Sequence, residues 1–224
     1  MSKRERSAVH KILEAALKKD WSLWRNYYEQ LKINDLIFLN LGVDGFIPEQ
    51  ICKTEKEIEA IFKLEEIDKS EKLDVIELGC YRGGLAYYIL RSFPKFIRSW
   101  TGYDINYYAV KAPIPRDIRY KGIKQVEWFY NLEFDPDANT FVSTSTLEHH
   151  SREQVVKIVE RLRNSNIKYI VIGLPLSDKN WEDYKGSHVL DMSREEITEL
   201  LEINGFKVFY NEKNKIWNWG AKRK

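Results

Sequence analysis

Short apolar runs alternate with helix-forming segments from Leu73 to the end of the chain, and this alternation limits the possible folds more than any other feature. An apolar run of about four to eight residues predicts a buried strand, and strands that alternate with helices predict βαβ units. Such units build a mostly parallel sheet with helices packed on both of its faces. The expected strands are 73–78, 99–103, one within 118–130, 141–145, 168–173, 206–210 and 215–220.

Helices are expected in the segments between these strands. Pro94 should end the first helix, because proline cannot donate the hydrogen bond that a helix interior requires. Ser151 is followed three residues later by Gln154, and Ser193 by Glu196, which is the capping-box pattern of a helix N-terminus. The expected helices are 84–93, 151–163 and 193–203.

The last two expected strands differ from the others, because only residues 211–214 separate them. A parallel crossover needs about a dozen residues or more, so this pair is expected to form an antiparallel hairpin. The predicted fold class is therefore α/β, a doubly wound and mostly parallel seven-stranded sheet with an antiparallel last strand.

The first third of the chain has helical rather than strand texture. Apolar side chains recur at helical spacing from Val9 to Leu17, and an aromatic stripe continues from Trp21 to Tyr28. We expect residues 1–69 to form a helical N-terminal cap or lid and residues 70–224 to form the main domain. The aromatic stripe can either pack onto the sheet or line a pocket.

Charge and cysteine content exclude several classes of protein. The net charge is only +2, so we do not expect a nucleic-acid partner, which usually requires a stronger basic excess. Cys52 and Cys80 are too few for a disulfide framework, and they have no zinc-site spacing. No apolar run approaches about 20 residues, and no apolar signal core follows the charged start MSKRERS, so we expect a cytoplasmic protein without a membrane span.

The first expected strand leads into a glycine-rich loop, in the stretch IELGCYRGG from Ile76 to Gly84. In open α/β sheets, ligands bind beyond the carboxyl ends of the strands. Gly79 permits a tight turn, Gly83 lets the next helix approach closely, and the amides at that helix start attract an anionic group. A dinucleotide loop reads G-x-G-x-x-G, whereas this chain has Tyr81 in place of the middle glycine. Glu77 disfavours a pyrophosphate but can meet a cationic ligand, directly or through water; a surface ion pair is the alternative.

The second expected strand ends in another acid, Asp104. A carboxylate at this position suits the two hydroxyls of a ribose, because each oxygen can accept one hydrogen bond. Ile105 can then lie against an adenine. The alternative role for Asp104 is to cap a helix.

Four segments resemble motifs of class I S-adenosylmethionine-dependent methyltransferases, in the order and spacing of that family. ELGCYRGG is similar to the first motif, [DE]-x-G-x-G-x-G, and GYDI to the motif that follows it. FVSTSTLEHH resembles the fourth-strand motif of the small-molecule branch, often ending in LEH, and residues 187–208 resemble the final helix and strand. Tyr81 departs from the family pattern, so its side chain must point away from the cofactor or cover it.

This resemblance covers residues 70–224 and implies a Rossmann-like methyltransferase fold with S-adenosylmethionine as cofactor. Trp128 could contribute to the adenine pocket, although core packing is an equal alternative. Cys80 is interpreted as a small loop residue rather than a nucleophile. The implied cofactor-binding residues are Glu77, Gly79, Cys80, Tyr81, Gly83, Asp104, Ile105, Trp128 and Ser145.

The fourth expected strand narrows the chemistry. Its end reads STSTLE, which lacks the proline motif of amino-methyltransferases that act on DNA bases and the acids that a magnesium-dependent enzyme needs. A metal-free mechanism is therefore expected, in which one histidine can act as a base. His149 and His150 follow the fourth strand, and His188 lies in the loop after the fifth. Capping of the helix that begins at Ser151 is the alternative role for the first two.

The predicted function is methyl transfer to an O or N atom of a small molecule or glycan precursor. The protein would mainly position the reactants. Two alternatives remain open: an RNA-modifying methyltransferase, and a methyltransferase-fold protein with other chemistry, such as aminopropyl transfer, or with binding only.

Overall fold

The computed structural model describes residues 66–68, 70–81, 83–106, 110–111, 115, 117–127, 129–174, 189–213 and 217–224. The predicted helical cap, residues 1–69, lies outside these residues except for 66–68. The predicted site residues Trp128 and His188 also lie outside them.

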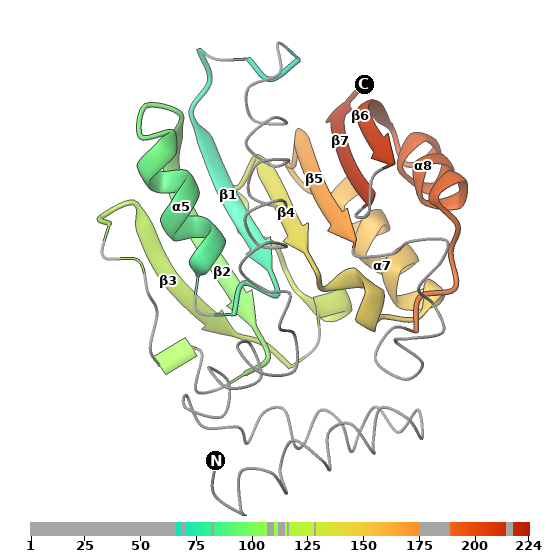
Figure 1. The fold of residues 1–224 in the computed structure, drawn as a ribbon, viewed down its shortest axis with the longest axis horizontal. Helices are drawn as coiled ribbons and strands as arrows, with labels where there is room; N and C mark the ends of the chain where they lie inside the picture. The colour runs from blue at the N-terminus through green and yellow to red at the C-terminus, as the bar shows by residue number, and fades with distance from the viewer. Residues whose placement is uncertain are drawn as a thin grey trace, which may run out of the picture.

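Within the described residues, seven strands form one sheet in the order β3-β2-β1-β4-β5-β7-β6 (Figure 1). The strands are β1 (Leu73–Leu78), β2 (Ile97–Asp104), β3 (Tyr120–Gln125), β4 (Thr140–Thr144), β5 (Tyr169–Leu174), β6 (Phe206–Lys213) and β7 (Trp217–Arg223). β7 runs antiparallel to both β5 and β6, and the other paired strands are parallel. The predicted fold class and the predicted antiparallel hairpin are confirmed.

The strand order identifies the edge beside β1 as the expected position of a ligand. The chain leaves β1 toward β2 on one side and later returns to β4 on the other, so the order reverses between β1 and β4. Leu78, at the end of β1, is in register with Tyr103 of β2 and Ser143 of β4. The loops that follow these three strands therefore meet at one edge, which is where open α/β sheets bind ligands.

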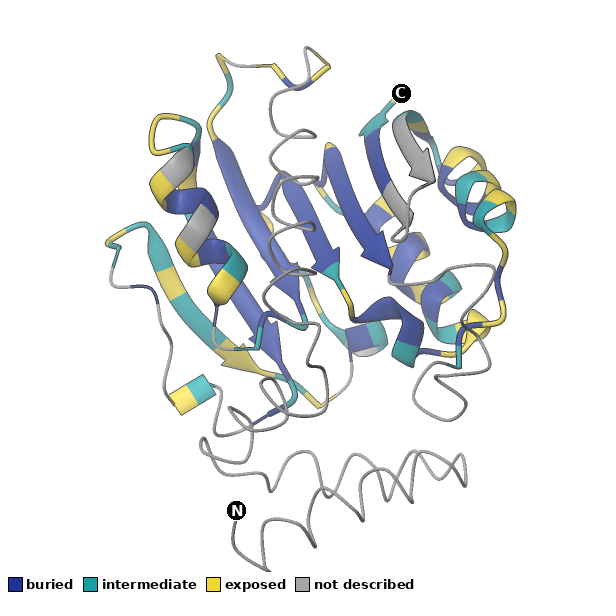
Figure 2. Ribbon diagram, viewed as in Figure 1, coloured by how far each residue is buried: buried dark blue, intermediate teal, exposed yellow. Residues whose placement is uncertain are grey.

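Helices cover both faces of this sheet. One core cluster joins α5 (Gly84–Ser92) to β1 and β2, and a second joins α7 (Arg152–Arg163) and α8 (Arg194–Ile203) to the opposite face. β1 and β5 are buried along their whole length because both of their faces are covered, whereas the edge strand β3 is partly exposed (Figure 2). Two short 3₁₀ helices, η2 (Phe129–Asn131) and η3 (Leu147–His149), lie in the connections. In the described part of the chain, every helix is too short or too polar to cross a bilayer.

Local sequence signals explain where α7 and α8 begin. The Ser151 side chain accepts a hydrogen bond from the amide of Gln154, whose side chain in turn binds the Ser151 amide. Ser193 and Glu196 form the same reciprocal pair at the start of α8. Both predicted capping boxes are confirmed, and each satisfies two amides that a helix N-terminus would otherwise leave unpaired.

Arg223, the last residue of β7, secures the C-terminal end of α7. Its guanidinium donates hydrogen bonds of 2.8–2.9 Å to four carbonyl oxygens. The acceptors are the carbonyls of Leu162, Arg163, Ser165 and Ile167. A helix C-terminus leaves its last carbonyls without intrahelical partners, and Arg223 binds two of these, Leu162 and Arg163, together with two carbonyls of the segment that follows the helix.

Arg223→Lys should destabilise the protein, because an ammonium cannot reproduce the planar fork of donors that reaches four carbonyls. We expect the free energy of unfolding to fall by about 1–3 kcal/mol, measured by urea denaturation. Arg91→Lys is the matched control, since Arg91 is exposed on α5 and should change stability by less than about 0.5 kcal/mol. Equal losses in the two variants would contradict the capping role.

Candidate functional site

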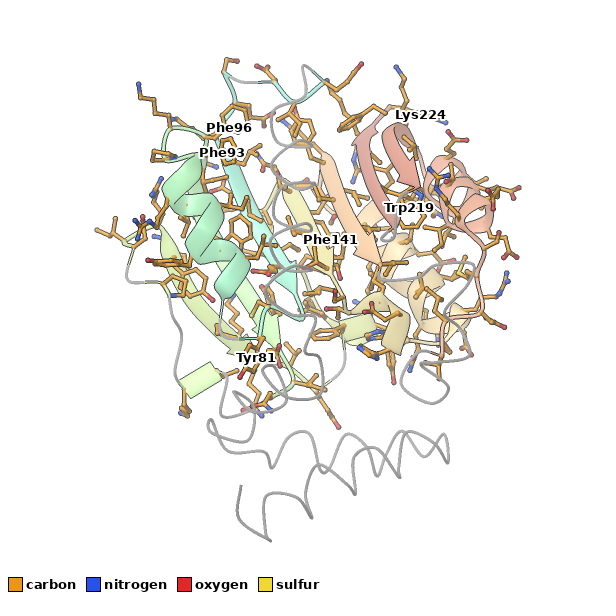
Figure 3. The ribbon with its side chains drawn as sticks, in the orientation of Figure 1. Tyr81, Phe93, Phe96, Phe141, Trp219 and Lys224 are labelled. Carbon is orange, nitrogen blue, oxygen red and sulfur yellow. The ribbon has the colours of Figure 1, made fainter. Side chains whose placement is uncertain are left out.

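The loop after β1 has an unusual backbone. Gly79, Tyr81 and Gly83 all adopt positive φ, at 68°, 47° and 80° (Tyr81 is labelled in Figure 3). Tyr81, the residue that departs from the family pattern, is therefore in the left-handed conformation that a glycine adopts without strain. The loop is fixed by hydrogen bonds from the Gly79 amide to the Tyr103 carbonyl, 2.9 Å, and from the Gly83 amide to the Cys80 carbonyl, 2.8 Å.

Gly79 is required by a close contact as well as by its φ angle. A Cβ atom on Gly79 would lie only 1.9 Å from Oγ1 of Thr146, in the loop after β4. Thr146 is buried, and its hydroxyl lies 3.0 Å from the Thr144 carbonyl and 3.3 Å from the Leu78 carbonyl. The loops after β1 and β4 are thus interlocked at the point where the predicted crevice begins.

Asp104 joins the loop after β1 to the loop after β2. Its carboxylate is 3% exposed, accepting hydrogen bonds from the amides of Tyr81 at 2.7 Å and Asn106 at 2.8 Å, one on each oxygen. Burial raises its pKa to about 6, although the amide bonds from Asn106, Tyr81 and Ile105 oppose that shift. The bond to the residue two positions ahead closes a local turn at the end of β2. Asp104, the last residue of β2, is therefore a buried carboxylate that connects two loops.

Glu77 points beneath the loop, into the core on the α5 side. It is 2% exposed, and its Oε2 accepts a hydrogen bond of 2.9 Å from the indole of Trp100. Burial raises its pKa to about 8; the indole bond opposes the shift, and the charge of Asp104 adds to it. This burial excludes the surface ion pair that its position at a strand end also allowed.

Cys80 packs beside Glu77. A Cβ on Gly102, the β2 residue in register with Glu77, would lie 2.5 Å from the Cys80 sulfur. Burial raises the pKa of this thiol well above its usual value. A buried, protonated thiol is a poor nucleophile, which agrees with its interpretation as a small loop residue.

The residues predicted to contact adenine are only partly described. Ile105 is half-buried and packs against the core cluster on the α7 and α8 side. Phe129, next to the undescribed Trp128, is buried in the same cluster, with its ring centroid 5.5 Å from that of His150. Ser145 is exposed at the end of β4 with a φ of 49°, a second non-glycine residue in the left-handed region.

The two described histidines have different environments. The side chain of His149 is 29% exposed, and its Nε2 lies 3.9 Å from Oε1 of Glu148, which is 1% exposed. His150 is buried, and its Nδ1 lies 3.1 Å from the Thr146 carbonyl. Burial lowers the pKa of His150 to about 4, so its ring is neutral in ordinary solution. Ser151, not either histidine, caps α7.

Three residues at this edge escaped the sequence analysis as members of the site. Trp100 was visible only as an apolar strand residue, because its pairing with Glu77 depends on the β1–β2 register. The sequence gives no indication that Thr146 belongs to the site, since nothing in it shows that Thr146 faces Gly79. Glu148 belongs to the LEH motif, and its position between a strand and a histidine is the signal that points to a role.

Several solved structures have a fold similar to that of this protein. No protein-family model matches the sequence, and no curated protein matches it. Magnesium protoporphyrin IX methyltransferase from Synechocystis PCC 6803, solved with bound SAM, is similar with a TM-score of 0.65 at 15% identity, over 91% of this chain and 96% of that one. Mitomycin 7-O-methyltransferase is similar with a TM-score of 0.57 at 14% identity, over 96% and 68%.

Human N-acetylserotonin methyltransferase, solved in complex with SAM, is also similar, with a TM-score of 0.59 at 15% identity over 76% of this chain. The chain spans about half, 51%, of the length of that human enzyme. At these identities the likeness concerns the fold, which is the Rossmann-like fold of class I methyltransferases, as predicted.

A pair of substitutions can isolate the backbone strain at Tyr81. Tyr81→Ala and Tyr81→Gly both remove the ring, but only glycine adopts the left-handed conformation without cost. We expect Tyr81→Gly to be more stable than Tyr81→Ala by about 1 kcal/mol in urea denaturation. At Tyr87, exposed within α5, the order should reverse, because glycine is about 1 kcal/mol worse than alanine in a helix. The same order at both positions would show that residue 81 is unstrained.

Stability should fall as the pH rises from about 4.5 to about 8, most steeply above about 6.5. Glu77 and Glu148 have folded-state pKa values of about 8, above those of an unfolded chain, so the folded protein holds extra protons that it loses toward pH 8. His150, with a pKa of about 4, acts in the opposite direction only below about pH 6.5. Glu77→Gln should reduce the loss between pH 6.5 and 8 by roughly 1 kcal/mol per pH unit.

Urea denaturation at several pH values measures this slope. Glu153→Gln is the control, since that exposed carboxylate pairs with Lys157, which lowers its pKa, and is ionised throughout this range. An unchanged slope in Glu77→Gln would mean that Glu77 is already ionised in the folded protein.

Proposed function

We propose that this protein is an S-adenosylmethionine-dependent methyltransferase that acts on an O or N atom of a small molecule or glycan precursor. The observation that carries the proposal is the buried Asp104 carboxylate. It is held beside the glycine loop, through the Tyr81 amide, at the switch point of a methyltransferase-type sheet. This arrangement supports a nucleoside ligand with its ribose at the end of β2.

The described residues fit this cofactor. Each oxygen of Asp104 accepts one amide bond and keeps acceptor capacity for a ribose hydroxyl. The amides at the start of α5, after Gly83, suit the carboxylate of the methionine part, and Ile105 can lie against the adenine. Ser145 would lie near the reacting end, and Trp128 remains a proposed wall of the adenine pocket. The buried side chains of Glu77 and Cys80 would support the loop from beneath.

The chemistry needs little from the protein beyond position. When bound, the sulfonium cofactor supplies an activated methyl group, and the protein aligns an acceptor with it. A histidine that takes the acceptor's proton would be His149, since it is partly exposed whereas His150 is buried and neutral. His188 stays a candidate. Serine and threonine at the end of β4, where metal-dependent relatives need acids, support a metal-independent mechanism.

The acceptor class is supported by the similar structures and by charge. The names of the three similar methyltransferases refer to porphyrin, N-acetylserotonin and mitomycin acceptors, which are small molecules. The net charge of +2 disfavours an RNA substrate, which is the first alternative. Binding without catalysis, or aminopropyl transfer, is the second. A cytoplasmic location belongs to the same proposal.

Calorimetry with S-adenosylhomocysteine and NAD tests the cofactor directly. We expect S-adenosylhomocysteine to bind and NAD not to bind, because Tyr81 replaces the middle glycine of a dinucleotide loop. Binding of NAD alone would refute the proposal.

Asp104→Ala tests the ribose position. It should weaken S-adenosylhomocysteine binding roughly tenfold to a hundredfold, because the diol loses a charged acceptor. It should also lower stability, since the carboxylate holds the Tyr81 and Asn106 amides. Asp74→Ala is the matched control: Asp74 is a buried acid in β1 near its opposite end, bonded to Arg98 and Ser99. This control should lose stability but keep its affinity, and equal affinities in the two variants would exclude the ribose role.

A further inference from the structure

A buried carboxyl group follows β4, at the same edge of the sheet as the glycine loop. The Glu148 side chain is 1% exposed, and its Oε2 has no hydrogen-bond partner among the residues that the structure describes. The position of Glu148 is fixed, because its carbonyl accepts hydrogen bonds from the amides of Val189 at 2.8 Å and Leu190 at 3.2 Å. A buried polar atom left unsatisfied costs about 1–3 kcal/mol, so it calls for a functional explanation or a bound partner.

His149 lies beside the other oxygen of the same carboxyl group. Its Nε2 lies 3.9 Å from Oε1 of Glu148, too far for a hydrogen bond but within ion-pair distance. A charge-assisted bond has a length of about 2.8 Å, so the pair needs a side-chain rotation that closes this gap. The imidazole is 29% exposed, whereas the side chain of Glu148 is 1% exposed. The histidine is therefore the member of the pair that a reactant can reach. An acid in this position can orient a histidine that faces a reactant.

Arg152 and His150, which also lie near Glu148 in the chain, interact with other groups. Arg152, in the first turn of α7, pairs with Asp191 at 3.5 Å and with Glu196 of α8 at 2.7 Å. His150 is directed at the Thr146 carbonyl and is neutral. Burial raises the pKa of Glu148 to about 8, opposed only by its own backbone. In the described residues around Glu148, His149 is therefore the group whose charge can compensate that of the carboxylate.

We propose that Glu148 and His149 form a dyad in which the buried carboxylate orients the imidazole, so that His149 accepts the proton of a hydroxyl or amine acceptor. This inference rests on the proposed methyl transfer and adds two things to it. Glu148 becomes a positioning residue, and the acceptor belongs to the class that loses a proton when it is methylated.

With a hydroxyl acceptor, a lone pair of the acceptor oxygen forms a bond to the methyl carbon while the carbon–sulfur bond breaks. The electron pair of the broken bond stays on sulfur, which becomes a neutral thioether. The hydroxyl proton passes to Nδ1 of His149. The Nε2–H group donates to Glu148, whose negative charge stabilises the imidazolium, and the proton then leaves to water.

The dyad can be tested by NMR titration of the full-length chain with labelled histidine, before any acceptor is known. His149 is assigned among the four histidines with a His149→Ala variant. We expect its titration midpoint to be about one pH unit higher in the natural protein than in Glu148→Gln, a tenfold difference in proton affinity, because a carboxylate favours the imidazolium. Glu153→Gln, an exposed carboxylate in the first turn of α7, should leave the midpoint unchanged.

The natural protein alone supplies a second measurement in case Glu148→Gln does not fold. Coupled groups titrate together, so the His149 signal should show a second inflection between about pH 7 and 9, where Glu148 loses its proton. A single inflection, or equal midpoints in the natural protein and Glu148→Gln, overturns the dyad. Binding of S-adenosylhomocysteine to the same samples tests the proposed function separately: failure to bind refutes that function, whereas normal binding with an uncoupled His149 refutes only the dyad.

Discussion

The candidate site depends on the two amide bonds that Asp104 accepts. This carboxylate is buried at the end of β2, where an uncompensated charge would be costly, and the amides of Tyr81 and Asn106 supply the compensation. Because one amide belongs to each loop, the same two bonds that make the buried acid tolerable also fix the loops relative to each other. The relative position of the two loops is therefore set by backbone amides, and it does not depend on ordering long side chains.

Buried acids near the two ends of β1 have different hydrogen-bond partners. Near its amino end, Asp74 is bonded to the guanidinium of Arg98 and the hydroxyl of Ser99, so a cation of the protein itself balances the charge. At the carboxyl end, Glu77 is bonded to an indole and Asp104 to amides, which are neutral donors. Burial accordingly raises the pKa of both acids. Shifts of this kind reduce stability at neutral pH, and functional sites are where such a cost is commonly retained.

The sequence predicted the elements of the fold better than the contacts of the site. Strand positions followed from apolar runs and helix starts from capping boxes, because both depend on residues close together in the chain. The direction of Glu77 was in principle readable, since alternation along β1 puts it on the same face as the buried Val75. Its bond to Trp100 was not readable, because it depends on the register between β1 and β2, and neither was the contact between Gly79 and Thr146, which depends on the β1–β4 pairing.

Tyr81 shows why a motif can lose a glycine and still form its loop. The loop geometry requires a left-handed residue at position 81, because the amide there must point at Asp104 while Gly79 and Gly83 make the turns on either side. Glycine meets that requirement without strain. Another residue can meet it if the surrounding bonds offset a strain energy of about 1–3 kcal/mol. A hydrogen bond to a buried carboxylate is worth a similar amount, so the Asp104 bond alone can hold Tyr81 in place. The glycine of the family pattern is thus the residue that forms this loop with the least backbone strain. The hydrogen bond to Asp104 offsets the strain that a tyrosine introduces there.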